Sequence, residues 1–389
     1  MTKERVLRQA RWVCKTIGSL GLVDPQRQLC RTPACWAYGR PGEGHVVIHS
    51  RAERRYQRKR CRRTFAETAG TALYRLRTTR DVVVVVLTLL AYGCPVQAIV
   101  AAFGRDERTV ARWQARAGAQ CRRVHEHLVQ GGRVEPGQVQ ADELRVRAVG
   151  GVLWLASAVA VPSRLWLGGA VRAARDGALI RALLERVRAC GPVRAMLLCT
   201  DGLAGYPTQA LRVFRAPERT GRVGRPRLRL PDGLLVAQAI KRYAKRRLAG
   251  VERRVVRGTA EAVATALAAT RASATAVINT AYVERPNATF RARLAPLARR
   301  TRAGVHRTAT LEAGMWLVGT AYNLCRPHRS LCRRDPRDGR RIDRTPAQAA
   351  GLTDRRWSPH ELLTFPAPGV APKRRGRRPR WLLDATRAA

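Results

Sequence analysis

Three acidic residues occupy positions from which their carboxylates could act together: Asp142, Asp201 and Glu284. Asp142 lies within "PGQVQADELRVRAV", a pattern that predicts a strand, and Asp201 directly follows the apolar run "MLLCT" before Gly202. Glu284 opens "YVERPNATFRARLAPLARR", in which every other charged residue is an arginine. Carboxylate oxygens bind hard cations such as Mg²⁺ or Mn²⁺, and two such ions can catalyse in-line displacement at phosphorus. The three acids therefore predict a divalent-metal site for phosphoryl transfer.

Two of these acids also have ordinary interpretations. Asp201 could cap the next helix, although Gly205 and Pro207 intervene before "PTQALRVF". Glu284 could be a single acid on a basic helix.

The segment after Glu284 predicts a helix whose polar residues bind nucleic acid. Helical spacing places Glu284, Asn287 and Arg291 on one face, at i, i+3 and i+7. Asn287 could bond a phosphate or a base, and Arg291 a phosphate oxygen. The DNA-binding residues expected in this segment are Arg285, Asn287, Arg291 and Arg293.

The composition points to a polyanionic partner. The 389 residues include 75 Lys+Arg against 27 Asp+Glu, a net charge of +48, while 46% hydrophobic residues fit a folded protein. A coding bias toward Arg is the alternative, but it does not explain the scarcity of acids. Nucleic acid is the expected partner, and no membrane is expected. The apolar stretch 82–103 is interrupted by Gly93-Cys94-Pro95, which leaves too few apolar residues to cross a bilayer of about 30 Å.

Pattern divides the chain into four regions. Residues 1–75 are basic and contain cysteines, 76–130 read as helices, and 135–330 alternate strand-like and helix-like runs. Residues 331–389 form a basic tail rich in Pro and Arg, apart from one short periodic segment, "TPAQAAGLTDRRWSPHELLTF". Alternating strands and helices predict an α/β catalytic domain with a sheet flanked by helices.

The 76–130 region predicts a helix-turn-helix domain. "DVVVVVLTLLAYG", "PVQAIVAAF" and a third helix from about Glu107 are separated by the Gly-Cys-Pro break and a turn at Gly104. Val110 and Trp113 are expected to point inward. The residues expected to face the DNA major groove are Arg108, Thr109, Arg112 and Arg116. An ordinary helical bundle with a solvated face is the alternative.

Cysteines near the N-terminus suggest a zinc-ribbon-like module. Cys30 and Cys35 have the spacing of a zinc knuckle, and Cys61 supplies part of a second pair. Arg58 stands where that pair needs its other thiolate. Either His45 or His49 completes a Zn²⁺ site, or the module is a degenerate ribbon held by packing.

Taken with these motifs, the sequence resembles the DDE-type transposases of bacterial insertion sequences, which share the RNase H-like fold of retroviral integrases. The resemblance rests on "QADEL", "CTDGLAGYP", "YVERPNATFRARLAPLARRTRAG" and "AYNLCRPHRSL". It implies that Asp142, Asp201 and Glu284 form the catalytic triad and bind Mg²⁺ or Mn²⁺, with Glu143 as the other choice for the first acid. Pro286 departs from the family pattern, and is tolerable where a helix begins near Glu284.

The resemblance also implies how such a protein would work. It predicts DNA binding at element ends, strand cleavage and strand transfer into target DNA, a homo-oligomer on the DNA, and a bacterial cytoplasmic, nucleoid-associated location. Two alternatives stay open: a DNA-binding regulator that cuts nothing, and a structure-specific nuclease of the same fold. In the tail, Arg375-Gly376-Arg377 resembles an AT-hook, and a solvated basic tail is the alternative.

Overall fold

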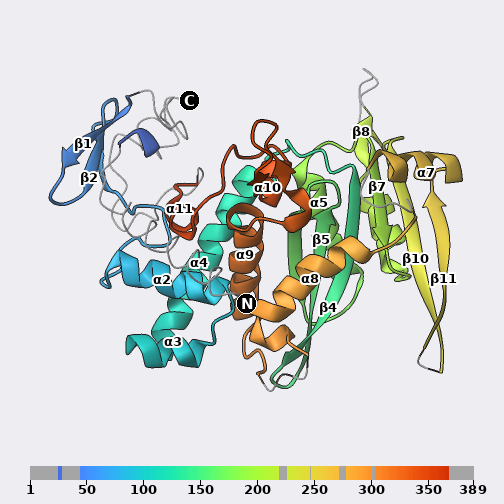
Figure 1. Cartoon of the computed structure of the whole chain (residues 1–389), viewed down its shortest axis with the longest axis horizontal. Coiled ribbons are helices and arrows are strands. Elements are labelled where there is room, and N and C mark those ends of the chain that lie inside the picture. The colour runs from blue at the N-terminus through green and yellow to red at the C-terminus, as the bar shows by residue number, and fades with distance from the viewer. Residues whose placement is uncertain are drawn as a thin grey trace. The chain divides into compact units, whose positions relative to one another are not determined.

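A computed structural model of the chain describes residues 25–28, 44–218, 226–245, 247–270, 277–299, 301 and 303–367 (Figure 1). They divide into two compact units. The larger contains the described residues between Arg77 and Phe365, and the smaller is built mainly from 25–28 and 44–76. The two units meet between Leu76 and Arg77.

The larger unit contains, among its described residues, a mixed sheet of six strands in the order β11-β10-β7-β4-β5-β6. Strands β10, β7 and β4 run parallel, and the other neighbours are antiparallel. The central strand β7 is buried along its whole length, which explains its uninterrupted apolar sequence. The strands are β4 (Gln138–Ala148), β5 (Gly151–Ala160), β6 (Leu165–Arg172), β7 (Met196–Thr200), β10 (Leu234–Ala244) and β11 (Arg247–Arg257).

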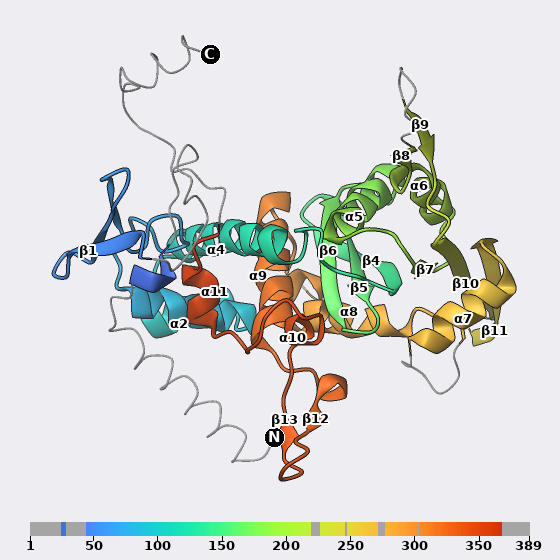
Figure 2. The ribbon, with the colours of Figure 1, turned by 90° about the horizontal axis from the view of Figure 1, so that it is seen from above.

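Helices cover both faces of this sheet (Figure 2). Helices α5 (Gly177–Cys190) and α6 (Gly205–Val213) lie on one face, and α7 (Ala260–Ala269) and α8 (Ala281–Arg293) lie on the other. The buried apolar residues of α5 recur at helical spacing, and the Asp176 side chain caps its first turn. The prediction of an α/β unit with a mixed sheet flanked by helices is confirmed.

Residues 77–128 form the expected helices: α2 (Arg80–Ala91), α3 (Val96–Phe103) and α4 (Glu107–Leu128). Gly104 takes the left-handed conformation (φ 57°) that ends α3. The second half of α4 packs along α9 (Thr308–Cys325), where a Cβ on Gly118 would lie 2.4 Å from the Ala313 Cα. The expected boundary between 76–130 and 135–330 therefore has no counterpart, because one helix serves both regions.

Part of the expected basic tail is folded onto the larger unit. The short helices α10 (Pro346–Ala349) and α11 (Pro359–Thr364) each begin with a capping box, and both pack on α9. The Gln120 side chain of α4 donates to the Phe365 carbonyl. The boundary expected at residue 331 is thus wrong for 331–365, whose buried apolar residues hold them in place. The AT-hook-like residues 375–377 lie outside the described residues.

Short elements complete the larger unit. They are β8 (Ala216–Glu218), β9 (Arg227–Arg229), η2 (Ala295–Leu297), η3 (Arg329–Leu331), β12 (Arg333–Arg334) and β13 (Arg341–Ile342). Within the ranges given above, no helix is both long enough and apolar enough to span a bilayer.

The smaller unit contains η1 (Pro25–Arg27) and an antiparallel sheet of β1 (Val46–Ser50), β2 (Arg55–Arg58) and β3 (Thr64–Ala66). Tyr56 and Phe65 pack in its core, and the Arg58 guanidinium lies 4.6 Å from the centre of the Phe65 ring. Arg58 therefore contributes to packing at the position where a zinc ligand was sought. Cys30 and Cys35 lie outside the described residues, and half-buried Cys61 follows β2.

Candidate metal-binding carboxylate site

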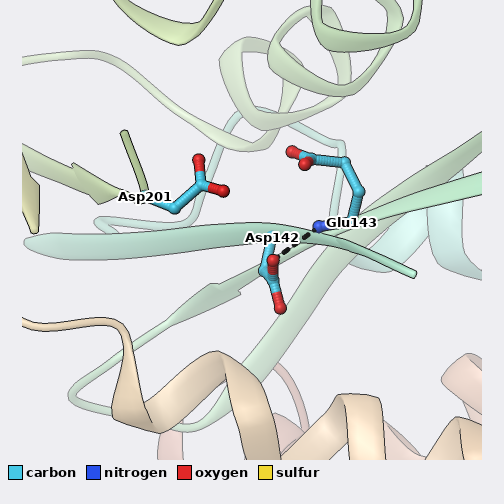
Figure 3. Close-up of side chains that lie close together, drawn as sticks. All are labelled: Asp142, Glu143 and Asp201. Carbon is cyan, nitrogen blue, oxygen red and sulfur yellow. Dashed lines mark hydrogen bonds between the residues drawn. The ribbon is translucent and has the colours of Figure 1, made fainter. Parts of the chain in front are cut away.

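Strand pairing brings three carboxylates together near the middle of the sheet. Asp142 and Glu143 are consecutive residues of β4, and Asp201 follows the last residue of β7, the parallel neighbour of β4. One carboxylate oxygen from each residue lies within 4.8 Å of the other two (Figure 3). Three acids at this separation can serve as ligands of a divalent cation.

Hydrogen bonds fix two of these carboxylates. Because successive strand residues point to opposite faces, Asp142 faces the α8 side, whereas Glu143 and Asp201 lie on the other side (Figure 3). Asp142 Oδ1 accepts from the Glu143 backbone N–H at 2.8 Å, and Oδ2 accepts from Asn287 Nδ2 at 2.8 Å. Asp201 Oδ1 accepts from the Leu203 N–H at 3.0 Å. The acids are thus oriented before any ion binds.

Arg175, in the loop between β6 and α5, places a cation between two of the acids. Its Nη2 lies 2.7 Å from Glu143 Oε2 and 3.1 Å from Asp201 Oδ2, and its Nε donates to the same Glu143 oxygen at 3.0 Å. The guanidinium also lies over the Trp154 ring, 5.3 Å from its centre. This position shows that a positive charge can be held between the Glu143 and Asp201 carboxylates.

Burial and mutual repulsion raise the pKa of two carboxyls. The pKa of Asp142 is raised mainly by burial and also by the charge of Asp201, and the Glu143 N–H opposes the rise. The pKa of Glu143 is raised mainly by burial, against the hydrogen-bonding influence of Tyr206 and Arg175. A nearby cation would favour the ionised form of both residues and so reverse this rise.

Glu143 has an oxygen without a partner. Its side chain has no exposed surface, and among the described residues neither Glu143 Oε1 nor the buried Tyr206 hydroxyl meets the geometry of a hydrogen bond. The two groups nevertheless lie close together, because Tyr206 lowers the pKa of Glu143 and Glu143 raises the pKa of Tyr206. A buried acceptor with no donor is costly, so this oxygen is open either to the neighbouring Tyr206 hydroxyl or to a ligand from outside the chain.

Glu284 lies outside the group of three carboxylates. Its side chain is 61% exposed, and Oε1 lies 3.6 Å from Lys241 Nζ on β10. The face of α8 predicted from the sequence nevertheless turns toward the acids, because Asn287 bonds Asp142 and the charge of Arg291 lowers the pKa of Asp142. The structure therefore brings together Asp142, Glu143 and Asp201, with Glu284 one helical turn from the Asn287 contact.

The Gln140 side chain docks the start of α8 on β4. Its Oε1 accepts from the backbone N–H groups of Tyr282 and Val283 at 2.7 and 3.1 Å, and its Nε2 donates to the Asn279 carbonyl at 2.8 Å. These bonds satisfy N–H groups that the first turn of a helix leaves free. The helix begins at Ala281 rather than near Glu284, so Pro286 lies inside it, where it is buried and supplies no N–H.

The predicted DNA-contacting residues divide by exposure. Arg108 and Arg112 are exposed on α4, and Thr109 and Arg116 are half-buried, while Val110 and Trp113 face the core as predicted.

On α8, Arg285 is exposed and Arg291 is half-buried. Asn287 is buried against Asp142. Arg293 is also buried: it donates to the Ala91 carbonyl at 2.8 Å and lies over the Tyr92 ring, and burial lowers its pKa to about 10. Asn287 and Arg293 thus have partners inside the protein in place of the DNA contacts expected.

Sequence reasoning missed Arg175 and gave Glu143 only a secondary place. Arg175 is one of many arginines, and only its position beside the helix cap Asp176 distinguishes it. Glu143 could have been weighed more heavily, since acids are rare in this chain and adjacent acids on a strand are rarer. Neither the protein-family models nor the curated proteins compared with this chain give a match.

Proposed function

We propose that the chain is a DNA transposase of the DDE type, which cuts and joins DNA strands at the ends of an insertion sequence. The observation that carries this proposal is the group Asp142, Glu143 and Asp201, whose carboxylate oxygens lie within 4.8 Å of one another in a chain of net charge +48. Acids gathered at one point of a strongly basic protein are suited to binding cations beside a polyanion.

The strand arrangement supports an RNase H-like fold as part of the proposal. Strands β4, β5 and β6 form an antiparallel meander, and β7 and β10 continue the sheet parallel to β4 on its other side. The first acids lie on β4 and the next directly after β7, so neighbouring strands deliver them to one place.

The residues present fit Mg²⁺ or Mn²⁺. Oxygen donors suit hard cations, and the Arg175 guanidinium already stands as a cation between two of the acids. Glu143 Oε1 is a buried acceptor that meets no donor at hydrogen-bond geometry within the described part of the chain. Asp142, Asp201 and Glu143 would hold the ions, and Glu284 would join them when DNA is bound. Bound ions would neutralise charge that develops during displacement at a phosphate.

The other residues of the site would position the DNA. Arg291 faces the Asp142 side of α8 and would hold a phosphate near the acids. Water would break one phosphodiester bond and free a 3′-hydroxyl, which would then form a new bond to a target phosphate while that phosphate releases its own 3′ oxygen. Joining two ends to one target requires at least two protomers, so we propose an oligomer on DNA.

DNA-end recognition would come from α2–α4 and the smaller unit. Exposed Arg108 and Arg112 at the start of α4 suit a helix-turn-helix recognition role, with Thr109 and Arg116 at its edge. The smaller unit would act as a zinc-ribbon-like module, in which Cys30, Cys35 and Cys61 would hold Zn²⁺ together with His45 or His49, or as a degenerate ribbon held by packing alone.

A DNA-binding regulator that cuts nothing is the second candidate. It is favoured by Glu284, whose carboxylate is mostly exposed and paired with Lys241 instead of joining the other acids. A regulator would bind DNA as the transposase does and yield no metal-dependent product.

The test uses a plasmid that carries the genomic flanks of the gene, with Mg²⁺ or Mn²⁺ and wild-type protein beside Asp201→Asn. We expect cuts at the element boundaries that require metal and disappear in the variant. Asp232→Asn, which alters an exposed acid in a loop, is the matched control and should cut normally. Equal DNA binding with no cutting by any protein would favour the regulator, and cutting of branched DNA without regard to boundaries would favour a nuclease.

A further inference from the structure

Three arginines from separate parts of the larger unit lie near His328, and one of them, Arg164, stacks on Tyr282 of α8. Arg164 belongs to the turn between β5 and β6, Arg285 to α8, and Arg326 to the end of α9. Burial is the main cause that lowers the pKa of His328, and the charges of all three arginines lower it further, to about 4. Arg285 is turned roughly 160° from Asn287 around the helix axis, so this arginine cluster lies apart from the acids.

The arginine cluster lacks a counter-charge within the described residues. Arg164, Arg285 and Arg326 form no ion pair with any carboxylate there. Burial lowers the pKa of half-buried Arg326, and the charge of Arg285 lowers it further. Partly buried like charges held together disfavour the folded state unless an anion joins them.

The protein holds Arg164 in place at some conformational cost. Its backbone has a positive φ of 58°, and its carbonyl accepts from the Tyr322 hydroxyl at 3.1 Å. Its guanidinium stacks on the Tyr282 ring, 4.0 Å from the ring centre, and its Nε reaches Ser330 Oγ at 3.5 Å. The arginine is thus preorganised rather than free in solvent.

His328 supplies a buried donor without an acceptor. Its Nδ1 accepts from the Ser330 backbone N–H at 3.3 Å, so in the neutral ring the hydrogen resides on Nε2. Nε2 is buried and has no partner among the described residues. An orphaned N–H beside three cations calls for an anionic oxygen.

We propose that Arg164, Arg285, Arg326 and His328 form a binding site for a phosphodiester group of DNA, separate from the carboxylate site. The assignment to DNA rests on the proposed function, whereas the anion site itself does not. About one helix diameter, 10–12 Å, separates opposite sides of α8. A DNA strand bound at this site would therefore lie beside the DNA strand at the acids. It would fix the position of the DNA along α8.

The test follows His328 by NMR at pH 5 in EDTA, with a His328→Gln variant to assign its signal. A ring with a pKa of about 4 is about one-tenth protonated at this pH, and a bound phosphate should raise that fraction. We expect a short single-stranded oligonucleotide to shift the signal at a lower concentration than inorganic phosphate. Arg285→Gln, a change on the protein surface, should weaken that response roughly tenfold, while exposed Arg212→Gln on α6 should leave it unchanged.

An unchanged His328 signal with both ligands would overturn the site. Equal affinity for phosphate and oligonucleotide would overturn the assignment to a DNA strand. EDTA removes divalent ions, so the carboxylate site does not contribute to the result. A His328 response together with failed plasmid cutting would support this anion site and refute only the transposase proposal.

Discussion

Asn287 on α8 donates a hydrogen bond from Nδ2 to Asp142 Oδ2 on β4 at 2.8 Å, across 145 positions of sequence. Asn287 is completely buried, and Asp142 is oriented on its other oxygen by the Glu143 N–H. The carboxylate that faces α8 therefore depends on the position of this helix. Any shift of α8 that moves Glu284 would also move Asn287 and so change its hydrogen bond to Asp142.

Replacing Asn287 with Ala should lower both stability and cleavage. The change removes a buried hydrogen bond and should cost about 1–3 kcal/mol in the free energy of unfolding, measured by urea denaturation. Asn287→Asp places a second carboxylate against Asp142 and should raise the pKa of one of the pair, so cleavage should need a higher pH. An Asn287→Ala protein with wild-type stability and cleavage would show that the contact is dispensable.

Replacing Arg175 with Met should strengthen metal binding. An incoming ion must displace the guanidinium from Glu143 and Asp201, so its removal should lower the Kd for Mn²⁺ roughly tenfold in calorimetry without DNA. Arg181→Met on α5 is the control, because Arg181 is exposed and contacts Gln209 instead of the acids. Weaker Mn²⁺ binding in Arg175→Met would mean that the arginine holds the carboxylates in place for the ion.

The sequence predicts the elements of this site better than their contacts. Periodicity indicated the β4 strand, the Asp201 turn and the Asn287–Arg291 face of α8, because strand and helix periods follow directly from local residue order. It placed Glu284 with the other acids, whereas that side chain extends to Lys241 on β10, a strand that the sequence had not paired with α8.

The misplaced domain boundary has a similar cause. Gly118 reads as an ordinary small residue within a helix, yet it allows α4 to lie against Ala313 of α9, almost two hundred positions away. Contacts of this kind depend on tertiary packing, which local pattern does not encode. The role of Arg175 escaped for the same reason.

Glu284→Gln and Glu143→Gln should separate metal binding from cleavage. Without DNA, Glu284 is largely exposed and outside the acid group, so Glu284→Gln should change the Kd for Mn²⁺ by no more than about twofold. Glu143→Gln should weaken it by roughly tenfold or more, since a buried ligand is lost.

Both Gln variants should abolish plasmid cutting if Glu284 joins the site on DNA. Lys241→Ala, which releases Glu284 from its ion pair, should preserve cutting. Normal cutting by Glu284→Gln would instead identify Glu143 as the third carboxylate of the site.

His125 on α4 should make the larger unit sensitive to mild acid. Its ring is fully buried beside Trp166 and Trp316, its Nε2 lies 3.1 Å from the Leu167 carbonyl, and burial lowers its pKa to about 4. The unfolded chain, with an ordinary histidine pKa near 6.5, therefore binds more protons than the folded chain between about pH 4 and 6.5.

Stability from the neutral His125 ring is present in full above about pH 6.5 and is lost as the pH falls toward 4, by about 3 kcal/mol in the free energy of unfolding. Urea denaturation at several pH values should show this loss in the wild type and a flatter profile in His125→Gln, whose amide can still donate to the Leu167 carbonyl. His306→Gln, a change at an exposed histidine, should keep the wild-type slope. Identical slopes for wild type and His125→Gln would mean that other groups cause the acid sensitivity.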